Sequence, residues 1–268
     1  MLESLQQSLA ALPWHIFAFG YALLTARYLL IAGLAGLVFY GWRRERRIET
    51  KIQPRWPRRA DYRREIGYSM LTFAVFILVG SFVLRGPLAP YHHLYGDVAK
   101  HGWGWFALSL PIVLVLHDAY FYWAHRLMHH PRLYRRAHLV HHRSTNPTPW
   151  AAFSFHPIEA AIEAGGILFI PFLMPVHVGV LALAMLFMTA YNAYGHLGWE
   201  LYPKGFADNP IGRFVNTSVS HNQHHAKARN NYGLYFLWWD RWFGTLDEEY
   251  AQAFDRAAGK AAPVQMNS

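Results

Sequence analysis

The chain has 268 residues, a formal net charge of +9 and an apolar composition, with 53% hydrophobic and only 15% charged residues. It contains no cysteine, which excludes disulfides, cysteine-ligated iron–sulfur clusters and thiolate-ligated haem within this chain. Long apolar runs with aromatic flanks are typical of membrane spans with interfacial belts, and this chain has 11 Trp, 16 Tyr and 18 Phe. The composition therefore predicts an integral membrane protein.

Four apolar stretches follow one another along the chain, at residues 14–40, 66–84, 105–123 and 158–194. Because roughly 20 residues cross the hydrocarbon core, the first three are expected to be single spans. The fourth is nearly twice as long and contains Pro171 and Pro175, which would break a helix. We therefore expect residues 158–195 to form a helical hairpin, and the chain to be an all-α membrane bundle of four to five spans.

Positive charge lies mainly between the first two stretches, where residues 43–65 hold ten Lys or Arg and four acidic residues. A basic segment between two spans indicates a cytoplasmic loop that faces anionic lipid, so the net charge does not require nucleic acid as a partner. The third span then returns to the cytoplasm near His125, and residues 126–149, with five Arg and no acid, agree with that side. Only a hairpin brings the later histidines back to the same side.

The expected organisation is a single membrane domain with a cytoplasmic, histidine-rich cap. Residues 14–123 form the first three spans, 124–157 hold the first two histidine boxes, and 158–195 form the hairpin. Residues 196–250 complete the cap with the third box, and residues 251–268 are expected to be a flexible tail. The membrane would be the inner membrane in a bacterium and the endoplasmic reticulum in a eukaryote.

Three histidine boxes indicate a metal site: His125-Arg-Leu-Met-His129, His138-Leu-Val-His141-His142 and His221-Asn-Gln-His224-His225. Spacings of three and four place the histidines of a box on one helical face, and neutral imidazole is a good ligand for iron, zinc or copper. No box contains the glutamate of a zinc-protease HExxH, since Arg126 follows His125. Soluble di-iron bundles use carboxylates, whereas the ligands here would be almost all imidazole.

Further motifs accompany the boxes: Leu133-Tyr-Arg-Arg, Phe155-His-Pro-x-Glu159, His196-x-Gly198, Asn231-Tyr-Gly233 and Trp239-Asp-Arg-x-Phe243-Gly-Thr245. Together with the boxes, they resemble the fatty acid hydroxylase / sterol desaturase superfamily over residues 118–245. The resemblance implies a membrane-bound non-haem di-iron oxygenase that uses O2 and two electrons to hydroxylate or desaturate a lipid.

The resemblance also implies the metal ligands, which are His125, His129, His138, His141, His142, His196, His221, His224 and His225. Some members of the superfamily have a further histidine where this chain has Asn192, so the Asn192 carbonyl or a water would take that place. The cofactors are then two iron ions. Zinc is expected to replace iron on overexpression, because imidazole binds both metals.

Other polar residues are candidates for supporting roles. Asp118 is expected to accept a hydrogen bond from a ligand imidazole or to pair with Arg126 or Tyr122, since an acid in a span needs a partner. His156 either starts a helix or supports the ligands. Asp240 is expected to pair with an arginine and lock the cap.

Charged and histidine residues near the boxes have simpler interpretations. Glu159 and Glu163 open the hairpin helix, where negative charge is favourable without a catalytic role. His130 is interpreted as structural, because it points about 100° away from its neighbour His129 in a helix. Three arginines either contact a lipid head group or only satisfy the positive-inside pattern, and these are Arg132, Arg135 and Arg136.

The favoured function is hydroxylation of a lipid C–H bond, with a sterol C-5 desaturase-like activity as the alternative. A non-enzymatic alternative is a histidine-rich metal transporter or carrier. Transport would place ionisable residues along a path across the membrane, whereas these histidines gather at one side. No electron-carrying domain fits within 268 residues, so a separate donor of the ferredoxin or cytochrome b5 type, with its reductase, is expected.

Overall fold

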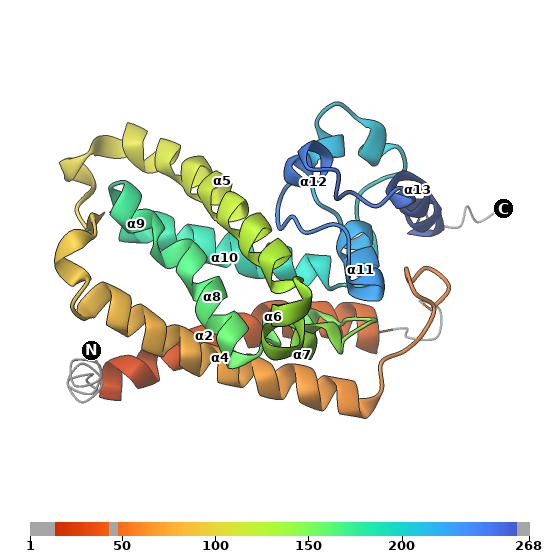
Figure 1. The fold of residues 1–268 in the computed structure, drawn as a ribbon, viewed down its shortest axis with the longest axis horizontal. Helices are drawn as coiled ribbons and strands as arrows, with labels where there is room; N and C mark the ends of the chain where they lie inside the picture. The colour runs from red at the N-terminus through yellow and green to blue at the C-terminus, as the bar shows by residue number, and fades with distance from the viewer. Residues whose placement is uncertain (1–13, 43–47, 262–268) are drawn as a thin grey trace.

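The computed structural model describes residues 14–42 and 48–261, and it is largely helical (Figure 1). Its long helices are α2 (Trp14–Gly36, continued by the π-helix η1, Leu37–Gly41), α4 (Arg59–Arg85), α5 (Gly102–Met128) and α10 (Val178–Gly195). Within the described ranges, four helices are long and apolar enough to cross a membrane, and they are these four. The predicted all-α membrane fold is confirmed.

Two of the long helices extend past the apolar stretches that predicted them. Helix α4 begins at Arg59, so residues 59–65 at the end of the predicted basic loop are helical. The Arg58 amide donates to the Asp61 carboxylate at 2.9 Å and caps this start. Residues 43–47 of that loop lie outside the described residues. Helix α5 runs on to Met128, which places His125 on its last turn, as expected. Polar residues extend both helices beyond the apolar stretches, because the backbone hydrogen bonds of a helix do not require an apolar environment.

The fourth apolar stretch reverses direction, as the two prolines predicted. It contains α8 (Pro157–Leu168), the one-turn helix α9 (Ile170–Leu173), the strand β2 (Val176–His177) and α10. Helix α8 has 12 residues, or about 18 Å at 1.5 Å per residue, which is too short to cross a bilayer of about 30 Å. The first arm of the hairpin is therefore a broken helix packed inside the bundle, and not a fifth long span.

The tip of the hairpin lies at the end of the bundle away from the histidine boxes. Strand β2 pairs in parallel with β1 (Leu94–Tyr95), in the loop between α4 and α5 that also contains η2 (Ala89–Tyr91) and η3 (Val98–Lys100). The His93 amide donates to the Pro171 carbonyl at 2.7 Å. Since α10 starts at this end, its last residues return to the level of the boxes.

The remaining elements form the cap, where α11 lies near the ends of α5 and α10 (Figure 1). Between α5 and α8 the chain forms α6 (Pro131–Ala137), α7 (Leu139–His142) and η4 (Pro149–Phe153). After α10 it forms η5 (Phe206–Asp208), η6 (Gly212–Phe214), α11 (Ser218–Lys227), α12 (Trp238–Trp242) and α13 (Tyr250–Ala261).

The flexible tail predicted for residues 251–268 is wrong over most of its length. Residues 250–261 form α13, whose Tyr250 and Phe254 are buried against Val219 and Leu237 in a core that belongs to the cap. Burial of these apolar side chains stabilises the helix despite its small and charged residues. Residues 262–268 lie outside the described residues.

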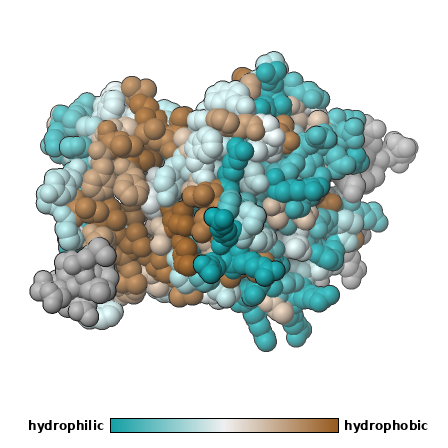
Figure 2. Space-filling model, in the orientation of Figure 1, coloured by the Kyte–Doolittle hydropathy of each residue, from teal (hydrophilic) through white to brown (hydrophobic). Residues whose placement is uncertain are grey.

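The surface agrees with a membrane location for the bundle. Figure 2 shows hydrophobic residues over the helical bundle and a mostly hydrophilic surface over the cap. Exposed large apolar residues occur on all four long helices, for example Leu30, Leu71, Leu108 and Leu186. A soluble protein rarely exposes so continuous an apolar surface.

Candidate metal centre

The fold brings all nine predicted ligands together at one end of the bundle. They come from the end of α5 (His125 and His129), from the start and body of α7 (His138, His141 and His142), from the end of α10 (His196) and from α11 (His221, His224 and His225). Their ring nitrogens form two groups: the first contains His125, His129, His138, His142 and His224, and the second contains His141, His196, His221 and His225.

Neighbouring histidines in the sequence belong to different groups. His142 joins the first group and His141 the second, and the same division separates His224 from His225. Consecutive side chains on a helix point about 100° apart, so each pair reaches toward both groups at once. Helices α7 and α11 are therefore the elements that hold the two groups next to each other.

In the first group the Nε2 atoms converge on one point. The Nε2–Nε2 distance is 3.0 Å between His125 and His138 and 3.1 Å between His142 and His129. It is also 3.1 Å between His142 and His138, and 3.0 Å between His224 and His142. All of these side chains are buried except His129, which is partly buried.

The second group has the same form with one ligand fewer. His196 lies 3.1 Å from both His221 and His225, measured between Nε2 atoms. His225 and His221 are 3.2 Å apart, and His196 and His141 are 3.4 Å apart. All four side chains are buried.

Contacts on the outer side of the rings fix which nitrogen faces inward. Backbone carbonyls accept from Nδ1 of His125 (Tyr232, 2.9 Å), His129 (Ala228, 2.9 Å), His224 (Asn230, 2.6 Å) and His196 (Asn192, 2.8 Å). A carbonyl oxygen only accepts, so Nδ1 carries the proton in these rings and Nε2 presents its lone pair to the group.

Lone pairs that converge in this way repel one another unless a cation lies between them. Ligands at right angles around a metal, with bonds of about 2.1 Å, are separated by about 3.0 Å, which is close to the spacing within both groups. The donor set and its geometry therefore fit two metal ions, with five imidazoles at one and four at the other.

The electrostatic environment keeps the imidazoles neutral. Burial, followed by the neighbouring histidines, holds the pKa of His138, His141, His221, His224 and His225 well below the usual value. The same causes lower the pKa of His142 to about 3, and burial lowers that of His196 to about 4. Near pH 7 the site is therefore a set of neutral ligands ready for a cation.

One supporting residue was missed at the sequence level. Glu159 was interpreted as a favourable charge at a helix start, but its buried carboxylate accepts from Nδ1 of His138 at 2.7 Å. A carboxylate on the outer nitrogen orients a metal-bound imidazole and raises its basicity. The Phe155-His-Pro-x-Glu159 motif was the signal that could have identified this role.

Asp118 and Asp240 support the site less directly than expected. Asp118 accepts from the amide of Tyr235 at 2.6 Å and not from an imidazole, Arg126 or Tyr122, so that prediction is wrong. Asp240 accepts from the amide of Tyr232 at 2.8 Å and from the Thr245 hydroxyl, instead of forming an ion pair with an arginine. Both carboxylates hold the segment whose Tyr232 carbonyl orients His125.

His156, His130 and Asn192 have identifiable local roles. The side chains of His156 and His130 accept hydrogen bonds from backbone amides and cap α8 and α6, which favours the helix-start interpretation of His156 and the structural interpretation of His130. The Asn192 amide nitrogen donates to the Ala152 carbonyl at 2.6 Å. Its position as an additional ligand of the four-histidine group stays a prediction.

The three arginines that precede the second box lie on α6 and are exposed. Arg132, Arg135 and Arg136 are thus available to solvent or to a lipid surface. No contact among the described residues distinguishes head-group binding from the positive-inside pattern, and both interpretations stay predictions.

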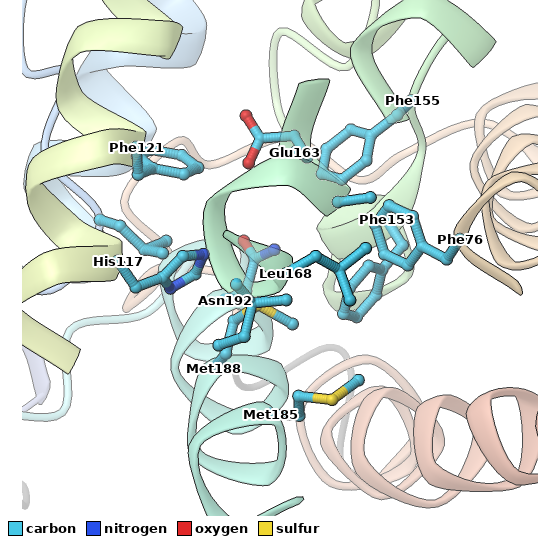
Figure 3. Close-up of a pocket in the computed structure, with 13 residues that line it drawn as sticks. Phe76, His117, Phe121, Phe153, Phe155, Glu163, Leu168, Met185, Met188 and Asn192 are labelled. Carbon is cyan, nitrogen blue, oxygen red and sulfur yellow. The ribbon is translucent and has the colours of Figure 1, made fainter. Parts of the chain in front are cut away.

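An apolar cavity with a free volume of about 70 Å³ lies beside the histidine groups (Figure 3). Helices α4, α5, α8 and α10 and the 3-10 helix η4 line it, with side chains that include Phe76, Phe153, Ile167, Leu168, Met185 and Met188. Its walls adjoin both groups, because the Phe121 ring lies 5.0 Å from that of His125 and the Phe155 ring lies 5.1 Å from that of His141. Its lining has the apolar character of a binding site for a hydrocarbon group.

Fold and site together define a helical membrane protein with two adjoining histidine groups, each suited to holding a metal ion, next to an apolar cavity. The sequence profile of the fatty acid hydroxylase family matches residues 110–245, which include all nine histidines. The chain belongs to this family, as its motifs indicated.

Curated relatives are sterol enzymes. The chain is 29% identical to Delta(7)-sterol 5(6)-desaturase ERG3B of Gibberella zeae over 82% of this chain and 68% of the relative. It is 33% identical to human lathosterol oxidase over 66% of this chain and 56% of the relative. It is 31% identical to Delta(7)-sterol 5(6)-desaturase erg3C of Aspergillus fumigatus over 57% of this chain and 52% of the relative. These alignments span about half to two thirds of the relatives' lengths, and no solved structure matches the chain.

Proposed function

We propose that this protein is a membrane-bound oxidoreductase that oxidises a C–H bond of a lipid with O2 and two electrons. The observation that carries this proposal is the position of two buried imidazole groups, with their lone pairs directed inward, beside an apolar cavity between membrane helices. Iron, when bound, supplies the activation of O2 and the removal of hydrogen from an unactivated carbon.

The residues of the chain would hold and orient the reactants. The five-histidine group and the four-histidine group would each hold one iron ion, with Asn192 or a water as a further ligand of the second. Phe121 and Phe155 line the cavity and contact His125 and His141, so a lipid group in the cavity would lie one aromatic ring away from each histidine group. The apolar lining excludes water, which protects the reaction from side products.

Desaturation is the preferred form of this reaction. The sequence alone slightly favoured hydroxylation, but the relatives are described as sterol desaturases and a lathosterol oxidase. Their names support the sterol C-5 desaturase-like alternative, with hydroxylation as the second candidate. Both reactions begin by removing hydrogen from carbon, and the position of the substrate decides which follows. The grouping of the histidines at one end of the bundle disfavours a metal transporter.

A separate ferredoxin- or cytochrome b5-type donor would supply the electrons from the cytoplasmic side. We expect Glu49 and Arg229, both exposed, to face the cytoplasm, and the exposed Lys100 to face the opposite side. Because the native chain has no cysteine, single cysteine substitutions at these positions test the topology with an impermeant thiol reagent. Labelling of positions 49 and 229 from opposite sides would refute it.

The direct test of the activity uses isotope-labelled oxygen. Membranes with the iron-loaded protein, a reducing system and 18O2 should yield a lipid about 2 mass units lighter by desaturation, or about 18 units heavier by hydroxylation. If no lipid changes mass while a soluble metabolite gains oxygen, the lipid-oxidase proposal is wrong.

A further inference from the structure

The apolar cavity contains one carboxylate. Of the residues that line it, His117, Glu163 and Asn192 are the ones that carry a polar side chain able to form a strong hydrogen bond. In Figure 3, Glu163 lies between the labelled Phe121 and Phe155, two cavity-lining aromatic residues whose rings contact the histidine groups. Glu163 is therefore at the part of the cavity that adjoins the metal centre.

The protein does not supply a partner for this carboxylate. Across residues 14–42 and 48–261, no hydrogen bond or ion pair to Glu163 is present, and the hydroxyl of the nearby Tyr120 donates to the Ile162 carbonyl at 2.8 Å. The other two polar residues are already held on one side. His117 Nδ1 lies 2.9 Å from the Tyr235 hydroxyl, and the Asn192 amide nitrogen bonds Ala152.

Glu159, on the same helix, is a carboxylate that has a hydrogen-bond partner and so serves as a comparison for Glu163. It lies one turn before Glu163 on the same face of α8, and it accepts from His138 at 2.7 Å. Glu163 has no corresponding imidazole. A hydrocarbon chain that filled the cavity would remove water from Glu163 and leave a buried polar group without a partner, which is costly.

We propose that Glu163 is a specificity-determining residue whose carboxylate accepts a hydrogen bond from a hydroxyl group of the lipid substrate. The protein would then act on lipid alcohols in preference to lipids without a hydroxyl at this point. The ring of apolar side chains accommodates the hydrocarbon body, and the carboxyl group of Glu163 selects the polar end. This inference rests on the proposed function, because it takes the cavity as the substrate site.

The experiment compares matched lipids on matched variants. A sterol and its 3-deoxy analogue, and a long-chain alcohol and the alkane of equal length, are bound to the detergent-solubilised, metal-loaded full chain, and affinity is measured by tryptophan fluorescence and thermal shift. Wild type should bind each alcohol about tenfold more tightly than its partner, which corresponds to about 1.4 kcal/mol and is within the range of one hydrogen bond. For E163L the ratio should fall to about one, with metal content unchanged, and for E163Q it should be intermediate.

A matched control is E248L, which removes an exposed carboxylate from the cap and should keep the wild-type ratio. Equal affinity of wild type for both members of each pair would overturn the inference, whether or not E163L folds. A wild-type ratio retained in folded E163L would overturn it too. Selective binding of alcohols without any lipid oxidation would leave this inference intact and refute the proposed function. Oxidation of both members of a pair at equal rates and with equal affinity would support the proposed function and refute this inference.

Discussion

The two histidine groups are similar in geometry but differ in how the protein supports them. In the first group, four of the five outer ring nitrogens face an acceptor, which is a backbone carbonyl for three of them and Glu159 for His138. In the second group, His196 bonds the Asn192 carbonyl, whereas the buried Nδ1 atoms of His141 and His225 have no hydrogen-bond partner among the described residues. The protein therefore orients the rings of the first group more fully than those of the second, whose arrangement would depend more on a bound metal.

Removing one ligand from each group should have the largest effect. We expect His224→Ala and His141→Ala each to abolish lipid oxidation and to lower the metal content from about two ions per chain, because a paired centre needs both ions. Elemental analysis and lipid mass spectrometry measure the two effects. His92→Ala, at the opposite end of the bundle where His92 bonds the Leu84 carbonyl, should leave both unchanged. Full activity in either ligand variant would refute the ligand assignment.

Glu159→Gln should weaken metal binding in the first group and leave metal binding in the second group unchanged. Loss of the charged partner of His138 is expected to weaken metal binding in the first group by about 10- to 100-fold, while the second group keeps its affinity. Competition with a chelator, followed by element-specific spectroscopy, reports the two ions separately. E248L is the control for the loss of a carboxylate elsewhere. Equal weakening at both groups would show that the difference in outer-nitrogen contacts does not determine affinity.

Acid should destabilise the metal-free protein through the buried, neutral histidines of both groups. In the metal-free protein, burial lowers the pKa of His196 to about 4 and, with neighbouring histidines, that of His142 to about 3. The unfolded chain therefore binds more protons between about pH 6.5 and pH 4, so the free energy of unfolding falls as the pH falls through this window. Burial raises the pKa of Glu159, Glu163, Glu200 and Asp240, so these carboxylates oppose the effect, but they are fewer than the buried histidines of the two groups. A Tm several degrees lower at pH 5 than at pH 7 is expected, and a flat profile would contradict it.

The sequence predicted which histidines gather, but not how they divide. The boxes and the reversal at Pro171 and Pro175 were sufficient to place all nine at one end, because helical spacing and bilayer thickness are local properties. The division of His141 from His142 depends on which helix faces each of them, which is a tertiary property. The same reason hid the bond between Glu159 and His138, which are 21 positions apart.

The wrong predictions for the C-terminal tail and for the partners of Asp118 and Asp240 had different physical origins. The apolar spacing of Phe254, Ala257 and Ala258 was a signal for α13 that the small residues around it obscured. The partners of Asp118 and Asp240 had no such signal, since both carboxylates accept from backbone amides of a loop. Every residue except proline carries such an amide, so side-chain chemistry alone does not identify the partner.

The most direct test of the central claim is anomalous X-ray diffraction from the iron-loaded protein at the iron absorption edge. The account predicts two peaks, one surrounded by the Nε2 atoms of His125, His129, His138, His142 and His224, and the other by those of His141, His196, His221 and His225. After partial chelation, the second peak should weaken before the first. A single peak, or two peaks outside these groups, would contradict the account.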